Sequence, residues 1–204
     1  MIIYQHRVNS LEDYKSLIVH PEFGYECDVR FIKGQPYLSH DLIYDTNGLI
    51  HLDSIIERFS DRNVIINVKE NGIDFNYISK IKLQCKSLLL LDLSFPEIVK
   101  AASLGLGENV MWRVSEFEGP SVDVLKSLEA KWIWLDSFNS YWFTEETIYK
   151  YQSNNLQVCM VSNELQGRDI YSEIESIKLS LEKKLFNAVC TKNPSFYLQI
   201  INQR

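Results

Sequence analysis

The sequence predicts an α/β protein whose fold is a compact, closed, parallel eight-stranded (β/α)8 TIM barrel. Short apolar runs alternate with amphipathic stretches along the whole chain, and about eight of each can be recognised. The 204 residues are at the short end for this fold, and no linker, repeat or low-complexity segment divides them. We therefore expect one domain over residues 1–204. An open doubly wound sheet has the same order of elements and stays open as an alternative.

The expected strands are short apolar runs between polar segments, and the expected helices are the amphipathic stretches between those runs. The strands cover residues 2–5, 25–31, 64–69, 87–91, 110–114, 132–136, 157–162 and 188–191. The helices cover residues 10–19, 51–59, 74–84, 95–103, 120–129, 144–153, 168–185 and 194–202.

Capping residues and prolines mark several helix starts. Ser10 and Thr144 each precede acidic residues, as is typical of a capped first turn whose carboxylates meet the positive end of the helix dipole. Pro96, Pro120 and Pro194 each lie where a first helical turn accepts proline. These signals support the predicted alternation of strands and helices.

Composition and charge argue against several classes of protein. The formal net charge is -6, and an acidic chain gains little from counterion release, so we expect no nucleic-acid partner. No secretory signal is visible and no apolar run approaches the roughly 20 residues that span a bilayer, so we expect no stable membrane insertion and a cytoplasmic location. The four cysteines lack the spacing of a zinc site, and we expect buried reduced thiols. No glycine-rich nucleotide-binding loop is present.

Two histidines and two carboxylates stand out near the start of the chain. His6 ends the first expected strand, Glu26 and Asp28 lie two residues apart in the second, and His40 ends an extended segment that follows. Residues two apart on a strand point to the same face, so the two carboxylates repel each other unless positive charge lies between them. A divalent cation, Mg²⁺ or Ca²⁺, would supply that charge. A buried ion network with Arg7, Arg30 or Lys69 is the alternative.

Further polar residues lie at the ends of the later strands, where the active site of such a barrel is found. Asn67 and Lys69 share one face of the third expected strand. Arg113, Asp136 and Glu164 follow at the ends of later strands, and we expect them to bind substrate. Arg113 could form bidentate hydrogen bonds with a phosphate or carboxylate of the substrate, or an ion pair with Glu116 or Asp136.

These motifs resemble the signature of the glycerophosphodiester phosphodiesterase family, which belongs with the phosphatidylinositol-specific phospholipase C-like barrels. The matching segments, in chain order, are His6-Arg7, Glu26-x-Asp28-Val29, His40-Asp41 and Ile66-Asn67-Val68-Lys69. The resemblance implies that His6 and His40 are the general acid and base. It also implies metal binding by Glu26 and Asp28 and phosphate binding by Arg7 and Lys69.

The chain departs from the family pattern at three places. Val8 stands where the family has glycine, and Asn67 stands where it has the third metal carboxylate, which removes one negative charge. We expect Asn67 to offer the metal one neutral oxygen, and a role as a hydrogen-bond partner alone is the alternative. His40 and Asn67 are also close in sequence, so the insertion that usually follows the second histidine is missing.

The resemblance implies a metal-dependent phosphodiester hydrolase that acts on a small phosphodiester through a cyclic phosphate. The oligomeric state stays open. One alternative is a non-catalytic barrel that binds a phosphorylated sugar or a lipid headgroup, in surface-polysaccharide metabolism. A second alternative is an unrelated barrel enzyme, in which His6, Glu26, Asp28 and His40 do not converge in space.

Overall fold

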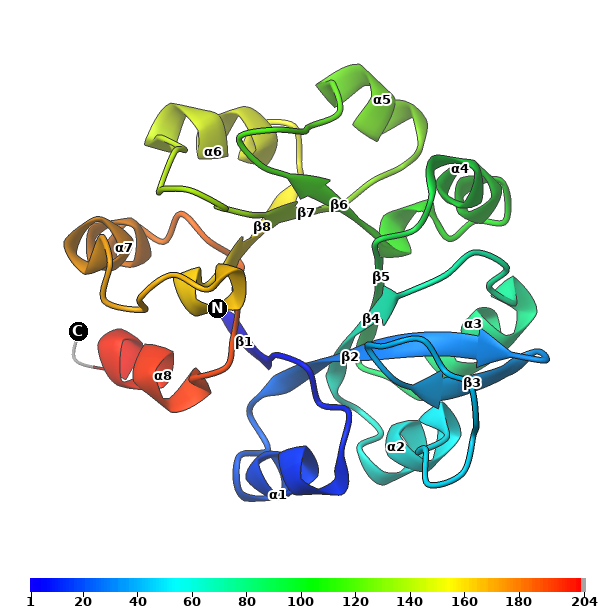
Figure 1. Ribbon diagram of the computed structural model, residues 1–204. Coiled ribbons are helices and arrows are strands. Elements are labelled where there is room, and N and C mark those ends of the chain that lie inside the picture. Colours follow the sequence, from blue (N-terminus) through cyan, green and yellow to red (C-terminus); the bar gives the residue numbers. More distant parts are fainter. Residues whose placement is uncertain (203–204) are drawn as a thin grey trace.

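The computed structural model describes residues 1–202, apart from the side chain of Ser16, and its strands form a closed ring (Figure 1). Eight parallel strands pair in the order β1-β9-β8-β7-β6-β5-β4-β2, and β1 also pairs with β2. The pairing of the first strand with both neighbours closes the barrel, so the predicted fold is confirmed over the open sheet. The barrel strands are β1 (Ile2–Gln5), β2 (Gly24–Ile32), β4 (Asn63–Val68), β5 (Ser87–Leu91), β6 (Val110–Val114), β7 (Trp132–Leu135), β8 (Gln157–Val161) and β9 (Ala188–Thr191).

Helices surround the ring of strands (Figure 1). They are α1 (Leu11–Val19), α2 (Leu52–Arg58), α3 (Phe75–Lys82), α4 (Phe95–Ser103), α5 (Val122–Ser127), α6 (Glu145–Gln152), α7 (Ile174–Glu182) and α8 (Pro194–Asn202). Two short 3₁₀ helices cover Gly107–Asn109 and Asn163–Gln166. The predicted capping at Thr144 is confirmed, because its side chain accepts the N–H of Thr147. Pro120 is an exception, since it precedes the Ser121 cap and lies outside α5.

The core has two layers, as the period of two along each strand requires. Inward side chains such as Tyr4, Ile65 and Trp134 fill the barrel, and a larger cluster packs between the strands and the helices. The inward positions change from apolar to polar toward the carboxyl ends of the strands, as in the step from Ile65 to Asn67 on β4. The apolar filling therefore supports a polar site at one end of the barrel.

A hairpin beyond the barrel rim is the main element that the sequence analysis did not assign as a strand. β3 (Gln35–Leu38) pairs antiparallel with the outer half of β2, from Val29–Leu38 to Ile32–Gln35. Lys33 and Gly34 both adopt positive φ, which matches a two-residue hairpin turn. The hairpin returns the chain to the rim at His40, so it places that residue near the end of β2.

Helix α7 is shorter than predicted. The expected span was residues 168–185, but Gly167 and Glu173 both have positive φ, so the helix begins only at Ile174. The four cysteines are described and all are unpaired; Cys27, Cys159 and Cys190 are buried, as expected, whereas Cys85 is only half-buried. Within residues 1–202, no helix combines the length and the apolar composition needed to cross a bilayer.

Candidate active site

The carboxyl ends of β1, β2 and β4 bring together most of the predicted site residues. Asp28 on β2 lies opposite Asn67 on β4 in the strand register, and Glu26 lies opposite Ile65. Ile65 belongs to the inner layer of the core, so Glu26, Asp28 and Asn67 also point into the barrel. His6 directly follows β1, and its ring lies beside Glu26.

Glu26 is completely buried and only half satisfied. Its Oε2 accepts the backbone N–H of Arg7 at 2.7 Å and lies 3.6 Å from His6 Nε2, whereas its Oε1 has no hydrogen-bond partner. Arg7 has a left-handed backbone conformation, with a φ of 55°, and in this conformation its N–H donates to the Glu26 carboxylate. Burial, together with the charge of Asp28, raises the pKa of Glu26 to about 7.

Asp28 is buried and fully engaged. Its Oδ1 lies 3.0 Å from Lys69 Nζ, and its Oδ2 accepts Asn9 Nδ2 at 2.7 Å and lies 3.4 Å from Arg7 Nε. The side-chain oxygen of Asn9 also accepts the backbone N–H of Asp28 at 2.9 Å, so one amide side chain bonds both the carboxylate and the backbone of Asp28. The ion network that the sequence left as an alternative is therefore formed at Asp28, while Glu26 contacts neither Lys69 nor the Arg7 guanidinium among the described ion pairs.

The two histidines occupy different environments. His6 is mostly buried, its Nδ1 has no partner, and burial together with nearby cations lowers its pKa to about 4. Its imidazole is therefore neutral near neutral pH and can accept a proton. His40 is half exposed, and its Nδ1 lies 2.9 Å from Asp41 Oδ1. Its position beside the site is fixed by the backbone, because the N–H of Ser39 donates to the carbonyl of Asp28 at 3.0 Å.

Arg30 and Asn9 support the site and were not among the predicted site residues. Arg30 is buried, and its guanidinium donates to the backbone carbonyls of His40 at 3.0 Å and Lys69 at 3.2 Å. It thereby joins two loops that carry predicted functional residues. A signal for Arg30 was available in the sequence, since it continues the face of Glu26 and Asp28 by one more period of two. Asn9 gave no such signal, because it lies in a loop.

The donor set suits a small hard cation. Glu26 Oε1 and Asn67 Oδ1 are buried acceptors without a hydrogen-bond partner, on adjacent strands. An unpartnered buried acceptor is costly, and oxygen atoms are the ligands that Mg²⁺ and Ca²⁺ prefer. Across residues 1–202, no group of three His, Cys, Asp or Glu side chains is placed to hold a metal ion. A cation here would therefore rely on the neutral Asn67 oxygen as well as the two carboxylates.

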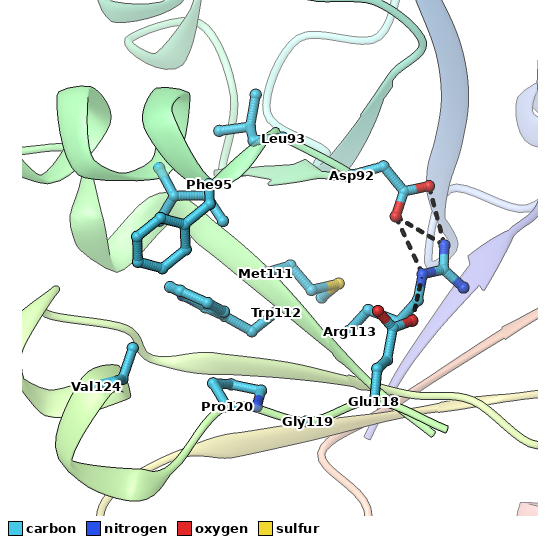
Figure 2. A pocket seen from close by; sticks show the side chains of 11 residues that line it. Asp92, Leu93, Phe95, Met111, Trp112, Arg113, Glu118, Gly119, Pro120 and Val124 are labelled. Atoms are coloured by element: carbon cyan, nitrogen blue, oxygen red, sulfur yellow. Dashed lines mark hydrogen bonds and ion pairs between the residues drawn. The ribbon is translucent and has the colours of Figure 1, made fainter. Parts of the chain in front are cut away.

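Arg113 and Asp136 form a separate, fully paired cluster on β6 and just after β7. Arg113 Nη2 lies 2.7 Å from Asp92 Oδ1, and Nη1 bonds to Asp136 (Figure 2 shows the Asp92 contact). Asp136 is buried and also accepts Gln166 Nε2 at 2.7 Å. Of the two ion pairs that the sequence suggested, the one with Asp136 is formed; Glu116 instead accepts backbone N–H groups.

Glu164 joins the ends of β8 and β9. Its Oε1 accepts the Thr191 hydroxyl at 2.6 Å and the Lys192 N–H at 3.0 Å, and its Oε2 bonds to Ser162. Its carboxylate is thus occupied by groups of the protein. At the carboxyl ends of β1, β2 and β4, by contrast, His6, Glu26 and Asn67 each have a buried polar atom without a hydrogen-bond partner.

Two solved structures are similar to this chain. A protein from Galdieria sulphuraria, assigned as a glycerophosphodiester phosphodiesterase, is 13% identical over 98% of this chain and 97% of its own, with a TM-score of 0.75. A phosphodiesterase from Oleispira antarctica, solved with the product sn-glycerol-3-phosphate, is 14% identical over 99% of this chain and 97% of its own, with a TM-score of 0.65. No family model and no curated protein matches the sequence. At these identities the likeness shows a shared fold, and both descriptions name phosphodiesterases, the activity class that the motifs resemble.

Proposed function

We propose that the protein hydrolyses a small phosphodiester at the carboxyl ends of β1, β2 and β4. One observation carries the proposal: residues from three separate segments of the chain meet at one end of the barrel, where His6 contacts Glu26 and Lys69 contacts Asp28, with His40 on the adjoining loop. The similarity to two barrels described as phosphodiesterases, one of them with a bound glycerol phosphate, supports this assignment.

We propose that a divalent cation, Mg²⁺ or Ca²⁺, is held by Glu26, Asp28 and Asn67. Their buried oxygen atoms provide the ligand type that these ions prefer. When bound, such an ion neutralises charge on the phosphoryl oxygens and activates an oxygen nucleophile. The positive side chains of Arg7 and Lys69, which contact Asp28, would bind the other phosphate oxygens.

His6 and His40 would move the protons. One imidazole takes the proton of the attacking hydroxyl, and the other gives a proton to the leaving alcohol. If the neighbouring hydroxyl of the substrate attacks, the product is a cyclic phosphate, and water then opens the ring by the same proton transfers in reverse. Arg30 keeps the His40 loop and the Lys69 loop at a fixed separation during these steps.

A substrate screen tests the proposal. Purified protein is assayed with Mg²⁺, Mn²⁺ or Ca²⁺ against glycerophosphodiesters, lysophospholipids and sugar-phosphate diesters, beside the His6→Ala variant. We expect metal-stimulated release of an alcohol from at least one class, lost in the variant and after chelation. Turnover that is equal in wild type and His6→Ala would contradict the proposed site.

A non-catalytic barrel that binds a phosphorylated sugar or lipid headgroup is the second candidate. The engagement of Asp28 by Lys69 and Asn9, and the neutral Asn67, favour it, because both weaken a cation site. Calorimetric titration with each metal and with diesters separates the two candidates. Ligand binding without turnover under every metal would support the second one.

A further inference from the structure

Lys192 directly follows β9 and continues the inward face of that strand toward the barrel mouth. Tyr4 on β1 lies opposite Cys190 on β9 in the strand register, and both side chains belong to the inner layer of the core. With a period of two, the next inward positions on these neighbouring strands are His6 and Lys192. The His6 N–H donates to the carbonyl of Thr191 at 2.9 Å, so the pairing of the two strands extends to this level. Lys192 therefore lies beside His6, at the same end of the barrel as the proposed active site.

The backbone of Lys192 is held in place, whereas its side chain is exposed. Glu164 Oε1 accepts the Lys192 N–H at 3.0 Å and the Thr191 hydroxyl at 2.6 Å. Burial is the main cause that lowers the pKa of His6, and the charge of Lys192 is one of those that lower it further, so this ammonium group lies within electrostatic reach of the ring. A fixed backbone thus presents a positive charge next to the imidazole.

The ammonium group of Lys192 differs from the other cations of the site in having no carboxylate partner. Arg7 and Lys69 both contact Asp28. The Glu164 carboxylate is occupied by hydroxyl groups and by a backbone N–H. Within residues 1–202, no ion pair includes the side chain of Lys192. Its charge is therefore available to a group of a ligand.

The arrangement of the strands indicates which part of a substrate would meet Lys192. β1 lies between β2 and β9, so His6 separates Lys192 from Glu26. The proposed ligands of the cation and of the reacting phosphate all lie on the side of β2 and β4. If His6 transfers a proton at one alcohol oxygen of the diester, the rest of that alcohol extends past the imidazole toward β9. Lys192 is then placed at the alcohol and not at the phosphorus atom.

We infer that Lys192 binds a negatively charged substituent, a carboxylate or a phosphate monoester, on the alcohol that lies over β9. The inference rests on the proposed function and names its substrate class, a small phosphodiester that carries a second anionic group. An ammonium group forms hydrogen bonds about twice as strong with an anionic acceptor as neutral groups form with each other, so it favours this substituent over a plain hydroxyl. It repels a cationic substituent such as choline.

Two pairs of diesters, whose members differ by one anionic group, test the inference. Glycerophosphoserine is compared with glycerophosphoethanolamine, and glycerophosphoglycerol that carries a terminal phosphate is compared with glycerophosphoglycerol itself. Calorimetry with Mg²⁺ present measures each Kd in the His40→Ala variant, in which we expect slow turnover. We expect the anionic member of at least one pair to bind about tenfold more tightly than its counterpart.

Variants of Lys192 show whether this residue causes the preference. In the same background, we expect Lys192→Met to remove the preference and Lys192→Arg, which keeps the charge, to retain it. Lys126→Met, at an exposed lysine of α5, is the control and should leave the preference unchanged. Equal affinities within both pairs, no binding of either anionic member, or a preference that survives Lys192→Met would each overturn the inference.

The outcomes separate this inference from the proposed hydrolysis. A preference that depends on Lys192, without turnover of any diester by the wild type, would contradict the hydrolase proposal and support the inference. Turnover of diesters without such a preference would support the hydrolase proposal and overturn the inference.

Discussion

Lys69 Nζ lies 3.0 Å from Asp28 Oδ1, and it neutralises a carboxylate that is otherwise sealed inside the barrel. Asp28 lies on β2 and Lys69 directly follows β4, so this contact also ties the end of β4 to β2. The same lysine is the proposed phosphate ligand, and its ammonium group has three N–H donors, so it can contact Asp28 and a phosphate oxygen together.

Removal of this ammonium group should cost both stability and activity. We expect Lys69→Met to lower the free energy of unfolding by about 3 kcal/mol, because a buried carboxylate loses its main partner. Urea unfolding measures the loss, and Lys80→Met on the exposed face of α3 is the control. The double variant with Asp28→Asn should regain stability without regaining turnover. A Lys69→Met protein as stable as wild type would contradict the pairing.

The histidine pair predicts a large and selective loss of turnover. We expect His6→Ala and His40→Ala each to reduce kcat by about two to four orders of magnitude, since each removes a proton-transfer group. His20→Ala is the matched control, because that ring contacts Phe23 and Glu22 away from the site. Steady-state kinetics on the best diester measure the effect. Full activity in either site variant would refute its role.

Restoration of the third carboxylate should strengthen cation binding. Asn67 lies opposite Asp28, and its Oδ1 is buried without a hydrogen-bond partner. We expect Asn67→Asp to lower the Kd for Mg²⁺ or Mn²⁺ by about tenfold, because each added ligand charge raises affinity. Calorimetry measures this Kd, with the exposed Asn76→Asp as control. An unchanged Kd would place the cation away from Asn67.

Arg30 should act through His40 and not through substrate. Lysine keeps the charge but cannot fork to the carbonyls of both His40 and Lys69, so we expect Arg30→Lys to lower kcat by about ten- to a hundredfold with little change in KM. The loss should be non-additive with His40→Ala. The exposed Arg58→Lys on α2 is the control. Additive losses would mean that Arg30 acts independently of His40.

The cysteines should react slowly and in a pH-dependent way. Burial raises the pKa of Cys85 to about 11, and it also raises the pKa values of Cys27, Cys159 and Cys190. Since the thiolate is the reactive form, alkylation of Cys85 should accelerate about tenfold for each pH unit until that value is reached. Intact-mass analysis after iodoacetamide treatment follows the reaction, with urea-unfolded protein as the fast reference. Rapid labelling of any thiol near neutral pH would contradict these environments.

The sequence alone determined the succession of strands and helices along the chain and which polar residues lie on the same face of a strand. These follow from local rules: a period of two put Glu26 and Asp28 on one side of β2, and capping chemistry marked Ser10 and Thr144. The sequence analysis did not predict β3 as a strand, because its pairing depends on the outer half of β2, which lies beyond the barrel.

Only the tertiary structure decided which charges meet. The sequence offered Asp28 either a cation or an ion network, and the choice depends on distances between β1, β2 and β4 that no local pattern encodes. The fold gave Asp28 the contacts of Lys69, Arg7 and Asn9 and left an oxygen of Glu26 unpaired. The fold likewise brought Glu164, which follows β8, into hydrogen bonds with the end of β9. The physical reason is that electrostatic partners are set by closure of the ring, which places residues remote in sequence within a few ångströms of one another.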